Sequence, residues 1–239
     1  MNPHVLGLKS QRLLYRIIVH FTLLLAATNL WSDVKTSDQP QAQHILKLNN
    51  ILVDKVKKEI RIRAKLAITQ GILEYLLVGN HGKTYESVFK VDDSKPSELN
   101  FALLLIGSKA MDFDEFLELK NGDNGPAILS ANHRQSLLEI DLLREGKKFD
   151  LQRLVTDREK SGQPFIWVYT GGFLIKDHGY AADLDLSYIG IWSDRLAVIN
   201  LFSDLKNPYR GDFGYEMNQA FEEELEVDQN FEIIIRRPE

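Results

Sequence analysis

The chain has 239 residues, 44% of them hydrophobic and 26% charged, which is typical of a globular protein. Its formal net charge is −5, and it contains no cysteine. This excludes disulfides, thiolate metal sites, iron–sulfur ligation, a cysteine nucleophile and a lipoprotein anchor. A chain of this length can bury a core without disulfides, so their absence does not exclude export.

The first 32 residues have the pattern of a secretory signal peptide. Three basic residues, Lys9, Arg12 and Arg16, precede a mainly apolar run over residues 17–27, and no acid occurs before Asp33. The apolar run is shorter than the roughly 20 residues that span a bilayer. We therefore expect a periplasmic or secreted protein, and the alternative is a protein held at the membrane by an uncleaved N-terminal segment.

Removal of residues 1–32 would take away three basic and no acidic residues, changing the formal net charge from −5 to −8. An acidic domain is a poor partner for nucleic acid or for anionic lipid surfaces. We expect an envelope protein or a small ligand as partner, with membrane contact only through an uncleaved N-terminal segment. A polar linker is expected at 33–47 and a single domain at 48–239.

The first clear strand is predicted over residues 58–68, because apolar and polar residues alternate strictly there. The predicted buried face carries Ile60, Ile62, Ala64, Leu66 and Ile68, and the opposite face carries Glu59, Arg61, Arg63 and Lys65. A wet face of this kind is usual for an antiparallel sheet, so we interpret the basic residues as solvated and not as an anion site.

Two further strands are predicted at 73–78 and 85–91, on either side of the sequence GNHGKT. The short polar stretch between two β-forming runs favours an antiparallel hairpin. Its glycines, Gly79 and Gly82, are then expected to supply the positive φ angles of the turn.

A helix is predicted at about 95–106. Pro96 suits a first helical turn, Glu98 is an acid near the N-terminus, and Gly107 is a plausible stop. Residues 99–106 are almost continuously apolar, which is typical of a helix buried on all sides. We expect it to pack across the sheet.

The rest of the chain reads mainly as strands and irregular segments. Irregular structure is expected at 108–134, strands at 137–144 and 231–237, a β-rich segment with a Gly-Gly bend at 164–175, and weak alternation at 184–200. Many strands, one strong helix and no βαβ rhythm predict an α+β fold, mainly an antiparallel β-sheet with one buried helix packed on it.

The common catalytic signatures are absent from the sequence. It contains no dinucleotide-binding G-x-G-x-x-G, no P-loop, no H-E-x-x-H and no G-x-S-x-G. Its six histidines are widely separated, and the acidic pairs do not have the spacing of a calcium-binding loop. We expect neither a metal nor a cofactor.

Two segments resemble the YdjY-like domain. In the first half, the matching positions are Glu74, Tyr75, Gly82, Lys83, Glu86, Ser87, Pro96, Leu103, Leu104 and Gly107. In the second half, they are Trp167, Tyr169, Thr170, Gly171, Ala182, Asp183, Ala197, Ile199 and Asn200. Tyr85 stands where the family pattern has histidine, which weakens any role that needs an imidazole there.

The resemblance covers most of residues 48–237 and implies an exported domain of unassigned function. Some members of the family carry iron–sulfur-type annotation through cysteines, a property that this cysteine-free chain cannot share. The motifs mark the family but imply no reaction.

Eight residues are candidates for a ligand or site role: Glu74, His81, Lys83, Tyr85, Glu86, Trp167, Tyr169 and Asp183. Glu74 and Glu86 flank the predicted turn and could bind a ligand or cation together with Lys83, or could be structural. His81 suits an exposed turn. Strand aromatics are more often core than carbohydrate-stacking platforms, and Asp183 suits a turn or an acid site.

Two functional hypotheses follow. The first is a non-enzymatic binding or interaction module of the cell envelope. The second is a carboxylate-based or metal-dependent hydrolase-like enzyme centred on Glu74, Glu86 and Asp183, which requires these carboxylates to converge.

Overall fold

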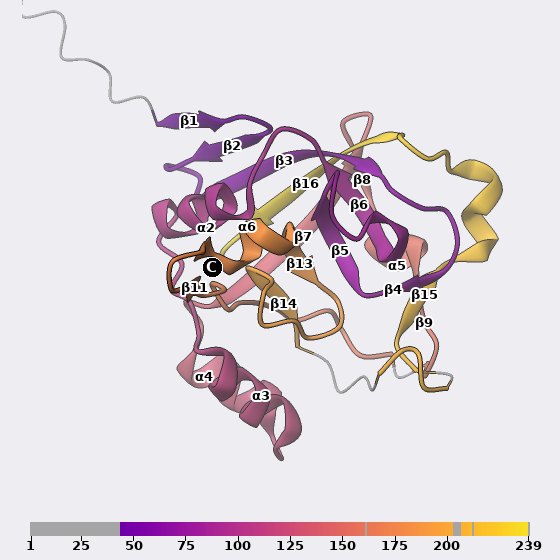
Figure 1. The fold of residues 1–239 in the computed structure, drawn as a ribbon. Helices are drawn as coiled ribbons and strands as arrows, with labels where there is room; N and C mark the ends of the chain where they lie inside the picture. The colour runs from indigo at the N-terminus through magenta and orange to yellow at the C-terminus, as the bar shows by residue number, and fades with distance from the viewer. Residues whose placement is uncertain (1–43, 161, 203–206, 212, 239) are drawn as a thin grey trace, which may run out of the picture. The chain divides into compact units, whose positions relative to one another are not determined.

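The computed structural model describes residues 44–160, 162–202, 207–211 and 213–238, without the side chains of 221–223, and eight of its strands close into a barrel (Figure 1). In order around the barrel they are β3 (Glu59–Leu66), β16 (Asn230–Arg236), β7 (Leu137–Arg144), β10 (Trp167–Tyr169), β14 (Ile199–Leu201), β13 (Ser187–Gly190), β5 (Tyr75–Gly79) and β6 (Ser87–Val91). Strand β6 pairs back with β3 and completes the ring. The pairs β13–β14 and β5–β6 are parallel, and the other pairs in the ring are antiparallel.

Shorter elements surround the barrel. Two strands, β1 (Ile45–Leu48) and β2 (Ile51–Asp54), extend the sheet from β3, and β8 (Lys147–Phe149) pairs with β7. A separate three-stranded sheet consists of β4 (Ile72–Leu73), β15 (Tyr215–Met217) and β9 (Val155–Asp157). A two-stranded sheet consists of β11 (Leu174–Ile175) and β12 (Gly179–Tyr180). The helices are α2 (Pro96–Leu105), α3 (Phe113–Asn121), α4 (Gly125–Asn132), α5 (Leu151–Leu154), α6 (Ala181–Asp185), η1 (Thr84–Glu86) and η2 (Gln219–Glu224). Within the described ranges, no helix has the length and apolar character needed to cross a membrane.

The predicted α+β fold, an antiparallel sheet with one buried helix, is wrong. The structure is mostly β, and the sheet is closed. Closure depends on two residue pairs, Lys65 with Lys90 and Leu66 with Phe89, beyond the point where β2 stops pairing with β3. A pairing of only two residues on each strand is too short to produce a periodic pattern in the sequence. The signal peptide predicted at 1–32 and most of the linker at 33–47 lie outside the described residues.

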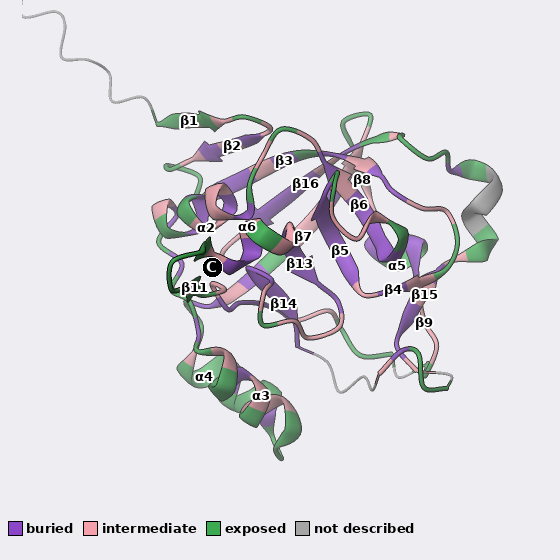
Figure 2. Ribbon diagram, viewed as in Figure 1, coloured by how far each residue is buried: buried purple, intermediate pink, exposed green. Residues whose placement is uncertain are grey.

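Strand β3 follows its prediction closely. Ile60, Ile62 and Leu66 are fully buried, as the alternation requires, and Figure 2 shows this burial continuing along the neighbouring barrel strands. The sequence predicted Glu59 on the solvent-exposed face of the strand, but this residue is only 6% exposed. Its carboxylate accepts from Arg61 Nε at 2.6 Å and from Arg236 Nε at 2.7 Å, so the buried charge is paired on both sides.

Helix α2 forms where predicted, but it is buried on one side only. Leu99 and Leu103 are fully buried, whereas Phe101 is 48% exposed and Leu104 is 54% exposed. The helix contacts β2, β13 and α6. Its apolar composition overstates its burial, because exposed apolar residues are common on folded domains.

The segment 108–134 is a helical hairpin, α3 and α4, and not irregular structure. Asp112 begins α3 by accepting from the backbone N–H groups of Asp114 and Glu115 at 2.9 and 3.1 Å. Phe116 and Leu129 pack with Val168 into a second small core. The sequence Asp-Phe-Asp-Glu at 112–115 is therefore the start of a helix.

Strands β5 and β6 are parallel and do not form the predicted hairpin. Tyr75 lies opposite Ser87 and Gly79 lies opposite Val91, so the chain returns to the start of β5 before it enters β6. The return runs through residues 80–83 and the 3₁₀ turn η1. This crossover is shorter than the dozen or so residues usual for parallel strands, so hairpin spacing was a misleading signal.

The two glycines of this crossover serve close packing and not a left-handed turn. Neither Gly79 nor Gly82 has a positive φ angle. A Cβ at Gly79 would lie 3.0 Å from Leu186 Cβ, and one at Gly82 would lie 3.2 Å from the same atom. Leu186 itself has a φ of 57°, so its backbone is already in the left-handed region.

We predict that Gly79→Ala lowers the free energy of unfolding by about 1–3 kcal/mol, the usual cost of an added methyl group in tight packing. Leu186→Gly should relieve the clash, so the double variant should recover at least about 1 kcal/mol relative to the sum of the single changes. Urea unfolding of the wild type and the three variants measures this coupling. Strictly additive effects would show that Leu186 is not the obstacle.

Candidate functional site

Two of the predicted carboxylates meet at one end of β5 and β6. Glu74 lies between β4 and β5, and Glu86 ends η1, just before β6. The backbone holds them in register, because Glu74 N–H donates to Glu86 O at 2.9 Å. The Glu74 carbonyl accepts from Ile191 and Trp192 N–H at 2.8 and 3.0 Å, which fixes this residue against the loop after β13.

The two side chains interact with each other as well. The two carboxyl groups are close enough for a side-chain hydrogen bond, and Glu86 is only 7% exposed. Burial, followed by the nearby charge of Glu86, raises the pKa of Glu74 from 4.5 to about 7, while Lys83 acts in the opposite direction. The raised pKa places the titration of Glu74 near neutral pH.

Tyr209 fixes the buried member of the pair. Its hydroxyl donates to Glu86 Oε2 at 2.7 Å, across 123 positions of sequence. Burial and then this hydrogen bond raise the pKa of Tyr209, so the phenol stays protonated and acts as a donor. The Tyr209 segment is itself held by Arg158, whose Nη1 donates to Pro208 O at 3.1 Å and to Phe213 O at 2.9 Å.

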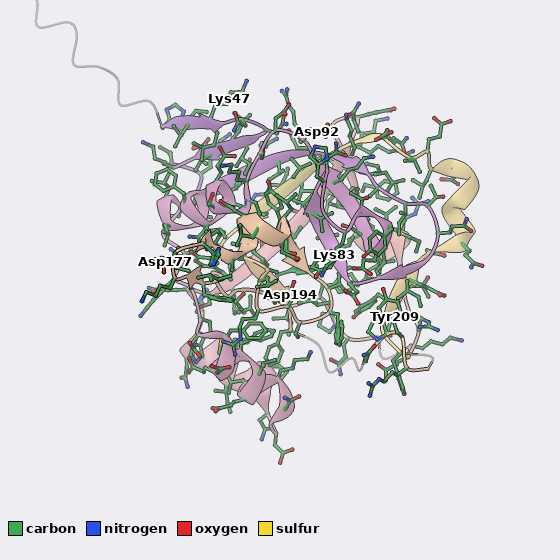
Figure 3. The ribbon with its side chains drawn as sticks, in the orientation of Figure 1. Lys47, Lys83, Asp92, Asp177, Asp194 and Tyr209 are labelled. Atoms are coloured by element: carbon green, nitrogen blue, oxygen red, sulfur yellow. The ribbon has the colours of Figure 1, made fainter. Side chains whose placement is uncertain are left out.

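A second polar chain begins at Lys83 (Figure 3). Lys83 Nζ donates to the Tyr75 hydroxyl at 2.8 Å, and this hydroxyl donates to Asp194 Oδ2 at 2.8 Å. Lys83 Nζ also lies 3.6 Å from Asp185 Oδ2, which accepts from Ser187 Oγ at 2.5 Å. Burial, followed by the Asp194 charge, raises the pKa of Tyr75, which keeps its proton in place between the lysine and the aspartate.

Asn200, on β14, holds Asp194 in position. It is fully buried, and its Oδ1 accepts from Asp194 N–H at 2.8 Å. Its Nδ2 donates to Asp194 O at 3.0 Å and to Thr170 Oγ1 at 2.8 Å. The Asn200 side-chain amide thus makes three hydrogen bonds. Gly190 leaves room for this amide, because a Cβ at position 190 would lie 2.9 Å from Asn200 Oδ1.

No described side-chain contact joins this pair to His81, Tyr85, Trp167 or Tyr169. His81 and Tyr85 are exposed, Tyr85 by 70%. Trp167 and Tyr169 belong to the main core, with 3% and 1% of their surface exposed. Strand position alone could not show whether these aromatic rings faced a ligand.

Asp183 does not converge with the two glutamates through any described contact. Its Oδ1 accepts from Ser97 N–H and its Oδ2 from Ser97 Oγ, both at 2.7 Å. It therefore satisfies a backbone donor in the first turn of α2, which is a structural role. Within the described ranges, no group of three or more His, Cys, Asp or Glu side chains is arranged to hold a metal ion.

Sequence reasoning missed Asp185, Asp194 and Tyr209. Asp185 and Asp194 lie within the weakly alternating segment 184–200, where nothing marked them as partners of Lys83 and Tyr75. Tyr209 lies in a segment without any motif. The partners are separated by more than 100 positions in two of the bonds, so local spacing held no signal for them.

We predict that Glu74→Gln increases stability at pH 8 but has little effect at pH 4. A carboxyl group whose folded pKa of about 7 exceeds its unfolded value of 4.5 binds more protons in the folded state, so stability falls as pH rises from 4.5 to 7. The full shift corresponds to about 3 kcal/mol, and partial exposure of Glu74 reduces this to about 1–2 kcal/mol.

Urea unfolding between pH 4 and pH 9 measures this dependence. Glu226→Gln is the matched control, because Glu226 is an exposed glutamate elsewhere in the chain. Parallel pH curves for wild type and Glu74→Gln would show that Glu74 titrates normally.

No family model, curated protein or solved structure matches this chain.

Proposed function

We propose that this protein is an acid–base hydrolase in which Glu74 and Glu86 are the catalytic pair. The observation that carries the proposal is the close approach of two carboxyl groups, with Glu86 buried and fixed by Tyr209 and with the pKa of Glu74 raised to about 7. Two carboxyl groups with this environment are suited to give and take protons at physiological pH.

The proposed chemistry balances within the pair. The ionised carboxylate takes a proton from water as the water oxygen attacks the electrophilic centre of the substrate. The protonated carboxyl gives its proton to the leaving group as the bond to that group breaks. The pair ends with one proton, as it began, and the products are the hydroxylated substrate fragment and the protonated leaving group.

Lys83 and Tyr75 support this chemistry from one side. The Lys83 side chain is 36% exposed, so its ammonium group is accessible to a substrate while it remains bonded to Tyr75. Its charge acts against the rise in the pKa of Glu74 that burial and Glu86 cause. The same charge would stabilise negative charge that develops on a substrate oxygen.

A purely binding role, the first of the two hypotheses from sequence, gives no account of two neighbouring carboxyl groups, one buried and the other with a raised pKa. Desolvating two like charges costs free energy, and such strain is characteristic of functional sites. The proposed enzyme also differs from the hydrolase expected from sequence, because Asp183 has no part in it.

The likeness to YdjY-like domains is part of the proposal. The two segments that carry it are far apart in the chain, yet Lys83 and Tyr75 from the first reach Asn200 of the second through Asp194. A shared site gives a physical reason for these positions to form one pattern. Export of the chain rests on the sequence of residues 1–32 alone.

A panel of p-nitrophenyl esters, phosphates and glycosides tests the proposed reaction. We expect turnover of at least one class, with a pH–rate profile that changes slope near pH 7 as Glu74 titrates. In Glu74→Gln, this change of slope should disappear together with most of the rate. Hydrolysis no faster than in buffer across the whole panel would contradict the proposal.

A further inference from the structure

A cleft of about 630 Å³ opens in the barrel wall, separate from the carboxyl pair. Strand β7 changes partner here: residues 137 and 138 pair with β10, and residues 142–144 pair with β8. The cleft lies along the stretch of β7 between these pairings and is continued by α5. Its volume falls within the range of about 300–1,000 Å³ that is common for small-molecule sites.

Aromatic rings form the inner wall of this cleft. Phe165 lies 5.9 Å from the Trp167 ring, centre to centre, and 5.5 Å from the Tyr215 ring. Phe149 is held on the other side by Phe231, at 5.7 Å and nearly perpendicular. These contacts fix the rings, so a planar ligand would meet a preformed apolar surface and not one that must first be ordered.

The rim of the cleft has more negative than positive groups. Its carboxylates are Glu139, Asp141 and Asp150, and its one cationic side chain is Lys148. Lys148 pairs with Asp141 at 2.7 Å, and Asp141 also accepts from Arg236 at 2.8 Å. Asp150 accepts from Gln152 N–H at 2.9 Å as the cap of α5, and neither it nor Glu139 has a described ion pair.

We propose that this cleft binds a small aromatic amine in its cationic form, with the ring against Phe165 and Trp167 and the ammonium group toward Asp150 and Glu139. The aromatic wall selects a planar apolar body, and Asp150 and Glu139, the lining carboxylates without a described ion pair, select a positive end. The proposal does not depend on hydrolysis, because the cleft shares no lining residue with the carboxyl pair.

Calorimetric titration of the full chain with two probes tests this selectivity. 1-Naphthylmethylamine and 1-naphthylacetate carry the same ring and opposite charges at pH 7. We expect the amine to bind at least about fivefold more tightly than the acetate, because Asp150 and Glu139 would attract an ammonium group and repel a carboxylate at the effective dielectric of a protein surface. Equal affinities, or no binding of the amine, would overturn the proposal.

Two glutamine replacements locate the binding. Gln152 is exposed and lines the cleft, so Gln152→Trp should fill part of it and weaken amine binding at least about tenfold. Gln135 is exposed and does not line it, so Gln135→Trp is the matched control and should bind as the wild type does. Equal affinity in both variants would place the amine elsewhere and overturn the assignment.

A third replacement tests the role of the rim charge. Asp150→Asn keeps an oxygen that can cap α5 but removes the negative charge. It should reduce the preference for the amine over the acetate while leaving the melting temperature close to that of the wild type. An unchanged preference would rule out Asp150 as the partner of the ammonium group and contradict the proposed orientation.

Discussion

Replacement of Asn200 by alanine is expected to lower the free energy of unfolding by about 3–4 kcal/mol. The change deletes the three hydrogen bonds of a fully buried amide and leaves Asp194 N–H, Asp194 O and Thr170 Oγ1 to be satisfied in other ways. Each buried group left without a partner costs about 1–3 kcal/mol, and such networks lose more than the sum of their parts. Urea unfolding measures the loss.

The control for this change is Asn218→Ala. Asn218 is partly exposed, and its side chain accepts one bond, from Ala220 N–H at 3.1 Å. We expect a cost of no more than about 1 kcal/mol. Hydrogen exchange should also become faster at Asp194 N–H in Asn200→Ala, because this group loses its acceptor. A cost similar to that of Asn218→Ala would show that Asn200 does not organise the loop.

Replacement of Glu86 by glutamine is expected to reduce hydrolysis at least about 100-fold. Glutamine has nearly the same shape and can still accept from Tyr209, so the fold should be retained. It cannot take a proton from water, and proton transfer by a positioned side chain contributes about 10²–10⁴-fold to a rate. The loss should appear in kcat, because the step that disappears is chemical and not substrate binding.

Asp183→Asn is the control for Glu86→Gln. Asp183 is a carboxylate on α6 that bonds Ser97 and lies outside the proposed machinery, so its replacement should leave kcat within about twofold. A third variant, Tyr209→Phe, should lower the rate less than Glu86→Gln does, because it loosens Glu86 without removing it. Full activity in Glu86→Gln would exclude Glu86 as a catalytic residue.

The sequence predicted those elements whose signal is local. Strand β3 follows from strict alternation, and α2 begins at Pro96 and ends at Leu105, shortly before Gly107, which has a φ of 80°. Strands β7 and β16 also form where they were expected. In each case periodicity or a terminal residue decides the structure, and distant contacts only reinforce it.

Barrel closure could not be predicted, because it depends on which strands meet. The β3–β6 contact is two residue pairs long, and the parallel pairing of β5 with β6 contradicts the hairpin that their spacing favours. Both features are set by the whole chain, since Gly79 and Gly82 are packed against Leu186, about 100 positions away. Propensity and turn composition do not contain that information.

The candidate site was predicted in its local part only. Glu74, Lys83 and Glu86 are close in sequence and do lie together, but Glu74 and Glu86 directly precede two parallel strands, β5 and β6, and do not face each other across a hairpin turn. Asp194 and Tyr209, which hold Tyr75 and Glu86, come from distant segments. Asp183 was a candidate site residue because it is an acid. Its hydrogen bonds with Ser97 show that residue type alone does not define a site.

The most direct test of the catalytic pair is the titration of Glu74 followed by carbon-13 NMR of labelled glutamate, with Glu74→Gln to assign its resonance. The account predicts a midpoint of about 7 in the wild type and a lower midpoint in Glu86→Gln, where the neighbouring charge is gone. A wild-type midpoint between about 4 and 5, the ordinary range for a glutamate, would contradict the account.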